Sequence, residues 1–183
     1  MAPIHNLHDK FVKHTLGNPV AAKAFIQHHL PKDIVAKIDL NSLRISNKTY
    51  VTPELKGLED DLVFECKINQ QPGYIYTIVE HQSTPDYLLP LRLIGYNITL
   101  IREFLQGKPE KTSWPIIINM CLYHGEEKPY PYSTDIYDYF VDPELAKNLK
   151  TLTECFLVDL TVMSDKEIED SGILKHDGKN AKV

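Results

Sequence analysis

The first forty residues have the hydrophobic pattern of helices. Apolar residues recur at helical spacing over 8–16 and over 20–30, and a Gly-Asn-Pro sequence separates the two runs. Gly and Asn commonly end a helix, and Pro suits the first turn of the next one. We predict two helices in these runs, with Pro31 ending the second and a short helical turn over 33–38.

From Leu43 onward, the spacing of apolar residues changes from that of helices to that of strands. An extended arm is predicted over 43–51. Apolar and polar residues alternate over 62–68, and an aromatic and β-branched run occupies 74–79. Residues 70–73, Gln-Gln-Pro-Gly, are typical of a turn. The two runs therefore predict an antiparallel hairpin.

A long helix and two further strands are predicted beyond the hairpin. Thr84 or Asp86 can cap the helix, which is expected to have Pro85 in its first turn and to run to about Leu105. The continuous apolar run over 115–123 predicts a buried strand, and 153–163 predicts another.

The last element expected is a helix that begins with a capping box formed by Ser164 and Glu167. The chain shows no internal repeat and no low-complexity segment. We therefore predict one α/β domain over residues 1–170, followed by a frayed or truncated tail over 171–183.

Composition narrows the class of protein. A hydrophobic content of 43% and a charged content of 25% are ordinary for a globular domain. The net charge of −5 excludes a polybasic nucleic-acid binder, although a local basic groove on an acidic body is not excluded. No apolar run is long enough for a transmembrane helix, and no secretory signal begins the chain, so we expect a cytoplasmic protein with no membrane partner.

The three cysteines, Cys66, Cys121 and Cys155, are widely spaced and odd in number. Each lies in an apolar stretch of sequence, as small buried hydrophobic residues do. The sequence predicts neither a disulfide framework nor a zinc site.

The most unusual feature is the sequence Glu80-His81-Gln82 at the end of an apolar strand. Polar groups there are costly unless they face a cleft or find partners. Strand alternation places Glu80 and Gln82 on one face, and the hairpin brings Asp61, at the start of its partner strand, toward the same end of the sheet. Two carboxylates with only oxygen ligands suit Mg²⁺ or Mn²⁺.

A second acidic pattern competes with this one. Glu65-Cys66-Lys67 also has an acid and a lysine separated by one residue. Asp61 and Glu65, however, lie on one strand about 13 Å apart, which is too far for one metal ion. A solvated polar face is the better interpretation of Glu65 and Lys67.

Four motifs occur in an order that resembles a known family. They are HDKFVKHTLGNPVAAKAFIQHHLP from His8, DLVF from Asp61, VEHQSTPDYLLPLRLIGY from Val79, and a strand that ends in YHG. The chain resembles the Rpn family of recombination-promoting nucleases, labelled "putative transposase" or YhgA-like, in the PD-(D/E)XK superfamily. The resemblance implies an α/β fold with a PD-(D/E)XK (restriction-endonuclease-like) core, in which helices flank a mixed central sheet.

The resemblance also assigns roles to individual residues. Asp61 and Glu80 match metal ligands of the family, with Mg²⁺ or Mn²⁺ as the cofactor. Gln82 stands where the superfamily usually has a catalytic lysine, and an amide can hydrogen-bond water but carries no charge. Asp9, in the N-terminal His8-Asp9 motif, is a further candidate metal ligand or a helix cap.

Three residues are candidates for contacting the substrate. Arg92 and Tyr96 are four positions apart on one face of the long predicted helix, and Arg92 is placed to meet either the Glu80 region or a phosphate. His8, in the N-terminal His8-Asp9 motif, is the third candidate for contacting the substrate.

Two functions remain open at this point. The first is a metal-dependent DNA endonuclease, related to recombination or mobile elements, with Asp61, Glu80 and Gln82 as its catalytic residues. The second is a catalytically impaired protein with the nuclease fold that acts as an interaction or oligomerisation module, so that its partner is a second copy of the chain. The acidic charge, the Gln82 amide and a C-terminus that is short for the family favour the second.

Overall fold

The computed structural model describes residues 14–46, 62–80, 85–106, 113–123 and 125–170, with the backbone alone for 78–80 and 168–170. The chain divides into two compact units, Met1–Ile136 and Tyr137–Val183, which are treated separately below. The single domain over 1–170 stays a prediction, and the tail over 171–183 lies outside the described residues.

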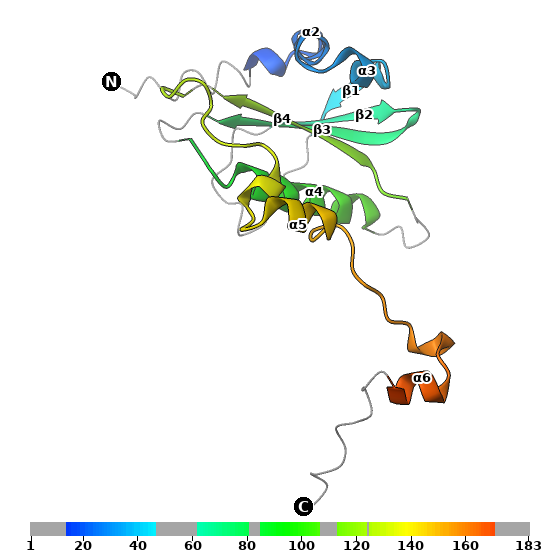
Figure 1. The fold of residues 1–183 in the computed structure, drawn as a ribbon. Coiled ribbons are helices and arrows are strands. Elements are labelled where there is room, and N and C mark those ends of the chain that lie inside the picture. Colours follow the sequence, from blue (N-terminus) through cyan, green and yellow to red (C-terminus); the bar gives the residue numbers. More distant parts are fainter. Residues whose placement is uncertain (1–13, 47–61, 81–84, 107–112, 124, 171–183) are drawn as a thin grey trace, which may run out of the picture. The chain divides into compact units, whose positions relative to one another are not determined.

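The first unit is a mixed sheet between two layers of helix, as the resemblance to the Rpn family implies. The sheet has the order β1-β2-β3-β4, antiparallel except for the parallel pair β3 and β4. Figure 1 shows α2 and α3 on one face and α4 on the other. The elements are α2 (Pro19–His29), α3 (Lys32–Val35), β1 (Ile38–Ile45), β2 (Leu62–Ile68), β3 (Gln71–Glu80), α4 (Leu89–Leu105) and β4 (Ile116–Tyr123).

Helix α2 confirms the prediction made from Pro19 and Pro31, and Asn18, assigned above to the end of the preceding helix, also caps this one. The Asn18 side chain accepts a hydrogen bond of 2.8 Å from the Val20 N–H, and Pro19 occupies the first turn. Proline lacks the N–H that a first turn leaves unsatisfied, so it costs little there. Leu30 ends the helix immediately before Pro31.

The turn of the hairpin lies earlier than predicted. Asn69 and Gln70 form it with φ values of 48° and 63°, and β3 begins at Gln71. Positive φ at both central residues is the geometry that matches the twist of a two-residue hairpin.

The glycine that suggested a later turn lies instead inside β3. A side chain at Gly73 would come within 2.6 Å of Ile68 and 3.1 Å of the Ile116 carbonyl oxygen. Close packing, rather than turn geometry, therefore explains this glycine.

Strand β1 begins earlier than predicted and contains an irregularity. The helical turn expected over 33–38 ends at Val35, and the strand begins at Ile38 rather than near 43. The register with β2 shifts between Asp39 and Arg44. Five positions along β1 face two along β2 there, so β1 has three extra residues, and an odd number of extra residues changes the face to which the following side chains point.

Helix α4 begins later than predicted. Its first residue is Leu89, with Pro90 rather than Pro85 in the first turn and no side-chain cap. Asp86 instead accepts a hydrogen bond of 2.8 Å from the Leu88 N–H. The side chain proposed as the cap thus holds the turn that precedes the helix.

The strand predicted over 115–123 is confirmed as β4, but its predicted burial is wrong, and the strand predicted over 153–163 is absent. β4 is an edge strand with exposed positions, including Ile116 at 47% exposure, because no described strand pairs with its outer side. The segment 153–163 forms no strand, and its Phe156 is 87% exposed. An apolar run therefore does not by itself establish burial.

The second unit holds short elements. They are η2 (Ile136–Tyr139), which spans the boundary between the units, α5 (Pro143–Asn148), η3 (Leu160–Val162) and α6 (Asp165–Asp170). The predicted capping box is confirmed before α6. The Ser164 hydroxyl and N–H donate to Glu167 Oε2 at 2.7 and 2.8 Å, and the Glu167 N–H donates to Ser164 Oγ at 3.4 Å.

The cysteines divide by environment. Cys66 is buried in β2, and burial raises the pKa of its thiol to about 11, with a further contribution from the Asp39 carboxylate. Cys121 and Cys155 are exposed, so the prediction that all three are buried is wrong for these two. Cys121 lies on the edge strand, and Cys155 lies in the segment that forms no strand.

Each face of the sheet carries its own hydrophobic core. The α2 face gathers Ile26, Phe64 and Ile75, each at 1% exposure or less, and the α4 face gathers Tyr76, Leu89 and Leu100. Alternation along β2 and β3 thus sends even-numbered residues of β2 and odd-numbered residues of β3 toward α2. Their neighbours point toward α4.

Candidate functional site

The candidate site lies at the end of the sheet where β2 begins and β3 ends. Leu62, the first residue of β2, pairs with Thr77, and Glu80, the last residue of β3, pairs with Tyr123 of β4. Three strands therefore have termini at this end. The hairpin brings the start of one strand and the end of its partner together, as the sequence predicts.

Most residues of the predicted site lie outside the described residues. His8, Asp9, Asp61 and Gln82 are among them, and Glu80 is described by its backbone alone. Within the described part of the chain, no three His, Cys, Asp or Glu side chains form a group that could hold a metal ion. The metal site thus stays a prediction.

Arg92 is described in full, and it binds Asp86. Its Nη1 lies 2.7 Å from Asp86 Oδ2, and both side chains are about one-fifth exposed. Burial by itself lowers the pKa of the Arg92 guanidinium, but hydrogen bonds to Asp86 and Tyr96 outweigh burial and raise that pKa. Arg92 is therefore a permanently charged group anchored to the turn before α4, and its contact with a phosphate stays a prediction.

Tyr96, the other candidate on α4, belongs to the core. Its side chain is 4% exposed, and its ring centroid lies 4.6 Å from that of Tyr76. The described role of Tyr96 is packing between the sheet and α4, within the core on that face. Its expected contact with the substrate is untested.

A group of tyrosines surrounds the turn before α4. The Tyr130 hydroxyl donates a hydrogen bond of 2.7 Å to the Asp86 carbonyl oxygen, and its ring meets that of Tyr123 edge-on at 4.9 Å. Tyr132 meets Tyr130 and Tyr87 in the same manner. These contacts hold the segment after β4 against the beginning of α4.

We expect Asp86→Asn to lower the free energy of unfolding by about 1–3 kcal/mol, because the hydrogen bond to the largely buried Arg92 loses the negative charge of its acceptor. Urea denaturation followed by far-UV circular dichroism measures this loss. Glu154→Gln is the matched control, since the pair of Glu154 with Lys150 is exposed and its loss should cost less than about 0.5 kcal/mol. Equal losses in the two variants would contradict the structural role of the Asp86–Arg92 pair.

The second acidic pattern is a solvated polar face at Lys67 but not at Glu65. Glu65 Oε2 lies 3.0 Å from both Nε and Nη2 of Arg44, and Glu65 Oε1 accepts a hydrogen bond of 3.1 Å from the Ser46 hydroxyl. The Glu65 side chain is 24% exposed. The prediction of a solvated face holds for the exposed Lys67 and is wrong for Glu65.

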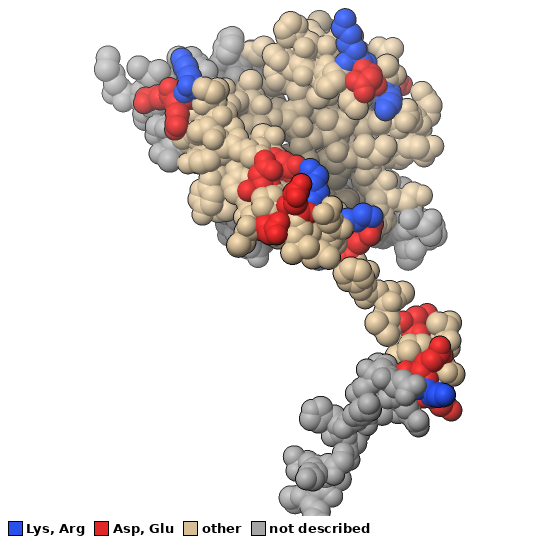
Figure 2. Space-filling view, in the orientation of Figure 1, with Lys and Arg blue, Asp and Glu red and all other residues tan. Residues whose placement is uncertain are grey.

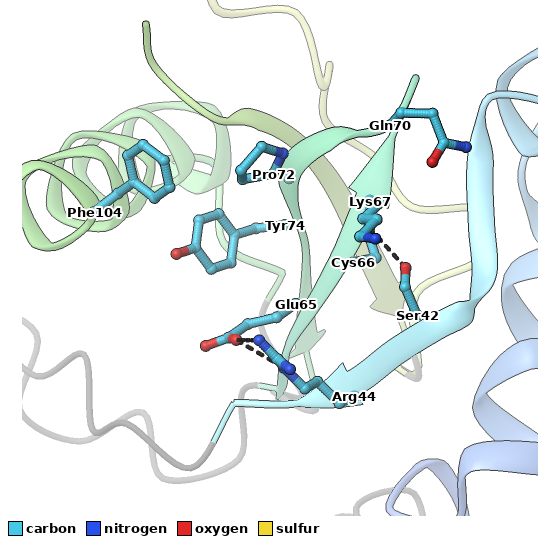
Figure 3. A pocket seen from close by; sticks show the side chains of 10 residues that line it. Ser42, Arg44, Glu65, Cys66, Lys67, Gln70, Pro72, Tyr74 and Phe104 are labelled. Carbon is cyan, nitrogen blue, oxygen red and sulfur yellow. Dashed lines mark hydrogen bonds and ion pairs between the residues drawn. The ribbon is translucent and has the colours of Figure 1, made fainter. Parts of the chain in front are cut away.

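These residues line a hollow of about 560 Å³ near the turn of the hairpin, called here the hairpin pocket (Figure 3). Its walls come from three strands and a helix on the α4 face of the sheet. They include Ser42 and Arg44 of β1, Glu65 and Lys67 of β2, Tyr74 of β3 and Phe104 of α4. The sequence pattern did not predict this pocket, although the alternation of Glu65 and Lys67 indicates one of its walls.

The surface charge agrees with the acidic composition. On the face drawn in Figure 2, the described Lys and Arg side chains are scattered and mostly adjoin Asp or Glu, with no continuous basic band. Strong sequence-independent attraction to DNA is therefore not expected from this face.

The fold and the candidate site define an α/β protein built on a mixed four-stranded sheet. The chain belongs to the YhgA-like transposase family, since the family described as "Putative transposase, YhgA-like" matches residues 6–176.

Curated relatives carry the names of nucleases. The chain is 35% identical over 161 residues to Recombination-promoting nuclease RpnD of Escherichia coli O157:H7, and 36% identical over 162 residues to Recombination-promoting nuclease RpnA of E. coli K12. Each match covers 88% of this chain, but only 61% of RpnD and 54% of RpnA. A further relative, 32% identical over 162 residues, is named Inactive recombination-promoting nuclease-like protein RpnE, and the match covers 88% of this chain and 53% of RpnE.

Two further findings concern solved structures and membrane-spanning helices. No solved structure matches the chain. Within the described residues, none of the helices combines the length and the apolar character needed to cross a membrane.

Proposed function

We propose that this chain is the core of a metal-dependent DNA endonuclease of the PD-(D/E)XK class. The observation that carries the proposal is the register of the hairpin, which brings the beginning of β2 and the end of β3 to one end of the sheet. The nuclease names of RpnD and RpnA support the class of activity.

The alternation of side chains along β2 and β3 favours placing the two proposed metal ligands on the same face of the sheet. Val63 of β2 and Tyr76 of β3 pair with each other, and both belong to the core on the α4 face. Asp61 precedes Val63 by two positions, and Glu80 follows Tyr76 by four. Because side chains alternate between faces along a strand, an even separation would place both carboxylates on the α4 face. Diagonal neighbours across an antiparallel pair lie about 7–8 Å apart, which lets two carboxylates reach one ion.

The donor set fits Mg²⁺ or Mn²⁺, because carboxylate oxygens are the ligands that these ions prefer. Asp61 and Glu80 would hold the ion, with Asp9 as a further ligand. When bound, such an ion lowers the pKa of a water molecule and neutralises charge that develops on a phosphate. Gln82 would accept or donate a hydrogen bond to that water, but its amide contributes no positive charge.

Plasmid nicking tests the proposal. Supercoiled DNA should be nicked in the presence of Mg²⁺ or Mn²⁺, and the nicking should stop when EDTA removes the metal and resume when the metal is restored. Nicking that continues unchanged in EDTA would contradict the metal-dependent mechanism.

The inactive relative favours a second candidate function. In that case the chain keeps the nuclease fold, lacks activity and acts through association with a second copy. Calorimetric titration with Mn²⁺ separates the two functions, because only the nuclease requires metal binding that depends on Glu80.

A further inference from the structure

We propose that the hairpin pocket binds one nucleotide unit of a single DNA strand, with the base toward α4 and the phosphate toward β1 and β2. This inference rests on the proposed nuclease function for the identity of the macromolecule. It concerns a different place in the fold, because Tyr74 in the pocket precedes Glu80 by six positions along β3, about 20 Å.

The charges of the pocket favour an anion. Its carboxylate, Glu65, is already occupied by Arg44 and the Ser46 hydroxyl. Lys67 is exposed, and no described residue forms an ion pair with its ammonium group. Arg44 uses Nε and Nη2 on Glu65, and within the described part of the chain its Nη1 has no partner. The groups free to bind a ligand are therefore donors from cationic side chains, which suit a phosphate.

The β1 irregularity explains why these donors meet. Leu43 and Ile45 belong to the core on the α2 face, so Ser42 and Arg44 point to the opposite face, beside Glu65. The Ser42 hydroxyl accepts a hydrogen bond of 2.8 Å from the Lys67 N–H, which fixes β1 beside the lysine. Bulges occur frequently where a strand must redirect side chains toward a site.

The opposite wall is apolar and aromatic. Tyr74, Pro72 and Phe104 lie together on the side of the pocket nearest to α4, as Figure 3 shows. Aromatic side chains provide surfaces on which bases of any sequence stack. Phe104 also lies in the last turn of α4, whose carbonyl groups carry partial negative charge and disfavour a phosphate at that wall. The two walls thus match the two ends of a nucleotide, and the volume of about 560 Å³ suits a ligand of that size.

The test is binding of a short fluorescein-labelled oligothymidylate in EDTA, measured by fluorescence anisotropy at several salt concentrations. Phe104→Leu removes the stacking surface and should weaken binding roughly five- to hundredfold, whereas Phe104→Tyr keeps the ring and should bind like the parent. Lys67→Gln should reduce the slope of log affinity against log salt by about 0.7, the value for one phosphate contact of a single strand.

Lys32→Gln is the control for charge, because Lys32 is exposed on α3 at the other face of the sheet and its loss should not alter the slope. A strand of abasic residues should bind equally to the parent and to Phe104→Leu. Unchanged binding of oligothymidylate to both Phe104→Leu and Lys67→Gln would overturn the proposal. Loss of affinity only for free thymidine monophosphate would also overturn it, since the pocket would then serve a free nucleotide.

The two proposals can fail separately. Binding in EDTA needs no cleavage, and Glu80→Gln should bind oligothymidylate like the parent. If pocket variants weaken binding while no metal-dependent nicking occurs, the nuclease proposal alone fails. If nicking depends on metal while the pocket variants bind normally, the pocket proposal alone fails.

Discussion

Replacing Glu80 with glutamine is expected to slow metal-dependent plasmid nicking on the order of 10²–10³-fold, because the amide keeps the shape of the side chain but removes the charge that we propose holds the metal. Asp61→Asn should have an effect of similar size. Nicking in Mn²⁺, with rates taken from the loss of supercoiled plasmid, measures both.

The control for Glu80→Gln is Asp33→Asn, a carboxylate-to-amide change at an exposed position of α3 on the opposite face of the sheet. It should leave both the nicking rate and the binding of Mn²⁺ unchanged. Calorimetric titration should show weaker Mn²⁺ binding for Glu80→Gln, with an unchanged thermal unfolding midpoint. Nicking by Glu80→Gln at the parent's rate would show that the carboxylate has no part in the reaction.

Phe64→Ala is expected to destabilise the first unit by about 3–5 kcal/mol. The Phe64 side chain is 1% exposed and lies in β2 within the core on the α2 face, so its removal leaves a cavity that the surrounding Ile and Leu side chains only partly fill. Since a domain is commonly stable by about 5–15 kcal/mol, this is a large share of the total. Urea denaturation followed by circular dichroism gives the value.

Phe156→Ala provides the matched control for Phe64→Ala. The same substitution at a side chain that is 87% exposed should change the free energy of unfolding by no more than about 0.5 kcal/mol. A similar loss of unfolding free energy at both positions would contradict the conclusion that burial of the side chain determines the size of the loss.

The sequence predicted best those elements whose pattern is local and regular. Strand β2 occupies Leu62–Ile68 as expected, because strict alternation with one buried face permits a single register. Helix α2 was equally predictable, because Pro19 marks its first turn and Pro31 follows its end. In both cases the information lies in neighbouring residues.

Features that depend on distant parts of the chain could not be predicted in this way. The apolar run of β4 is compatible with a central or an edge strand, and only the order of the sheet decides between them. The beginning of α4 was ambiguous because two prolines, Pro85 and Pro90, compete for the first turn. For the candidate site, strand alternation identified the shared end of the hairpin, but the anchoring of Arg92 by Asp86 depends on a turn that the pattern does not specify.

The pairing of the strands also implies an order of folding. β2 and β3 join through a two-residue turn, whereas Gly73 of β3 pairs with Ile116 of β4, 43 positions further along the chain. Closing a long loop costs more entropy than closing a short one, so local pairs form more readily. We therefore expect the hairpin of β2 and β3, which contains Glu80, to form first. Helix α4 and strand β4 would then join β3 after it has paired with β2.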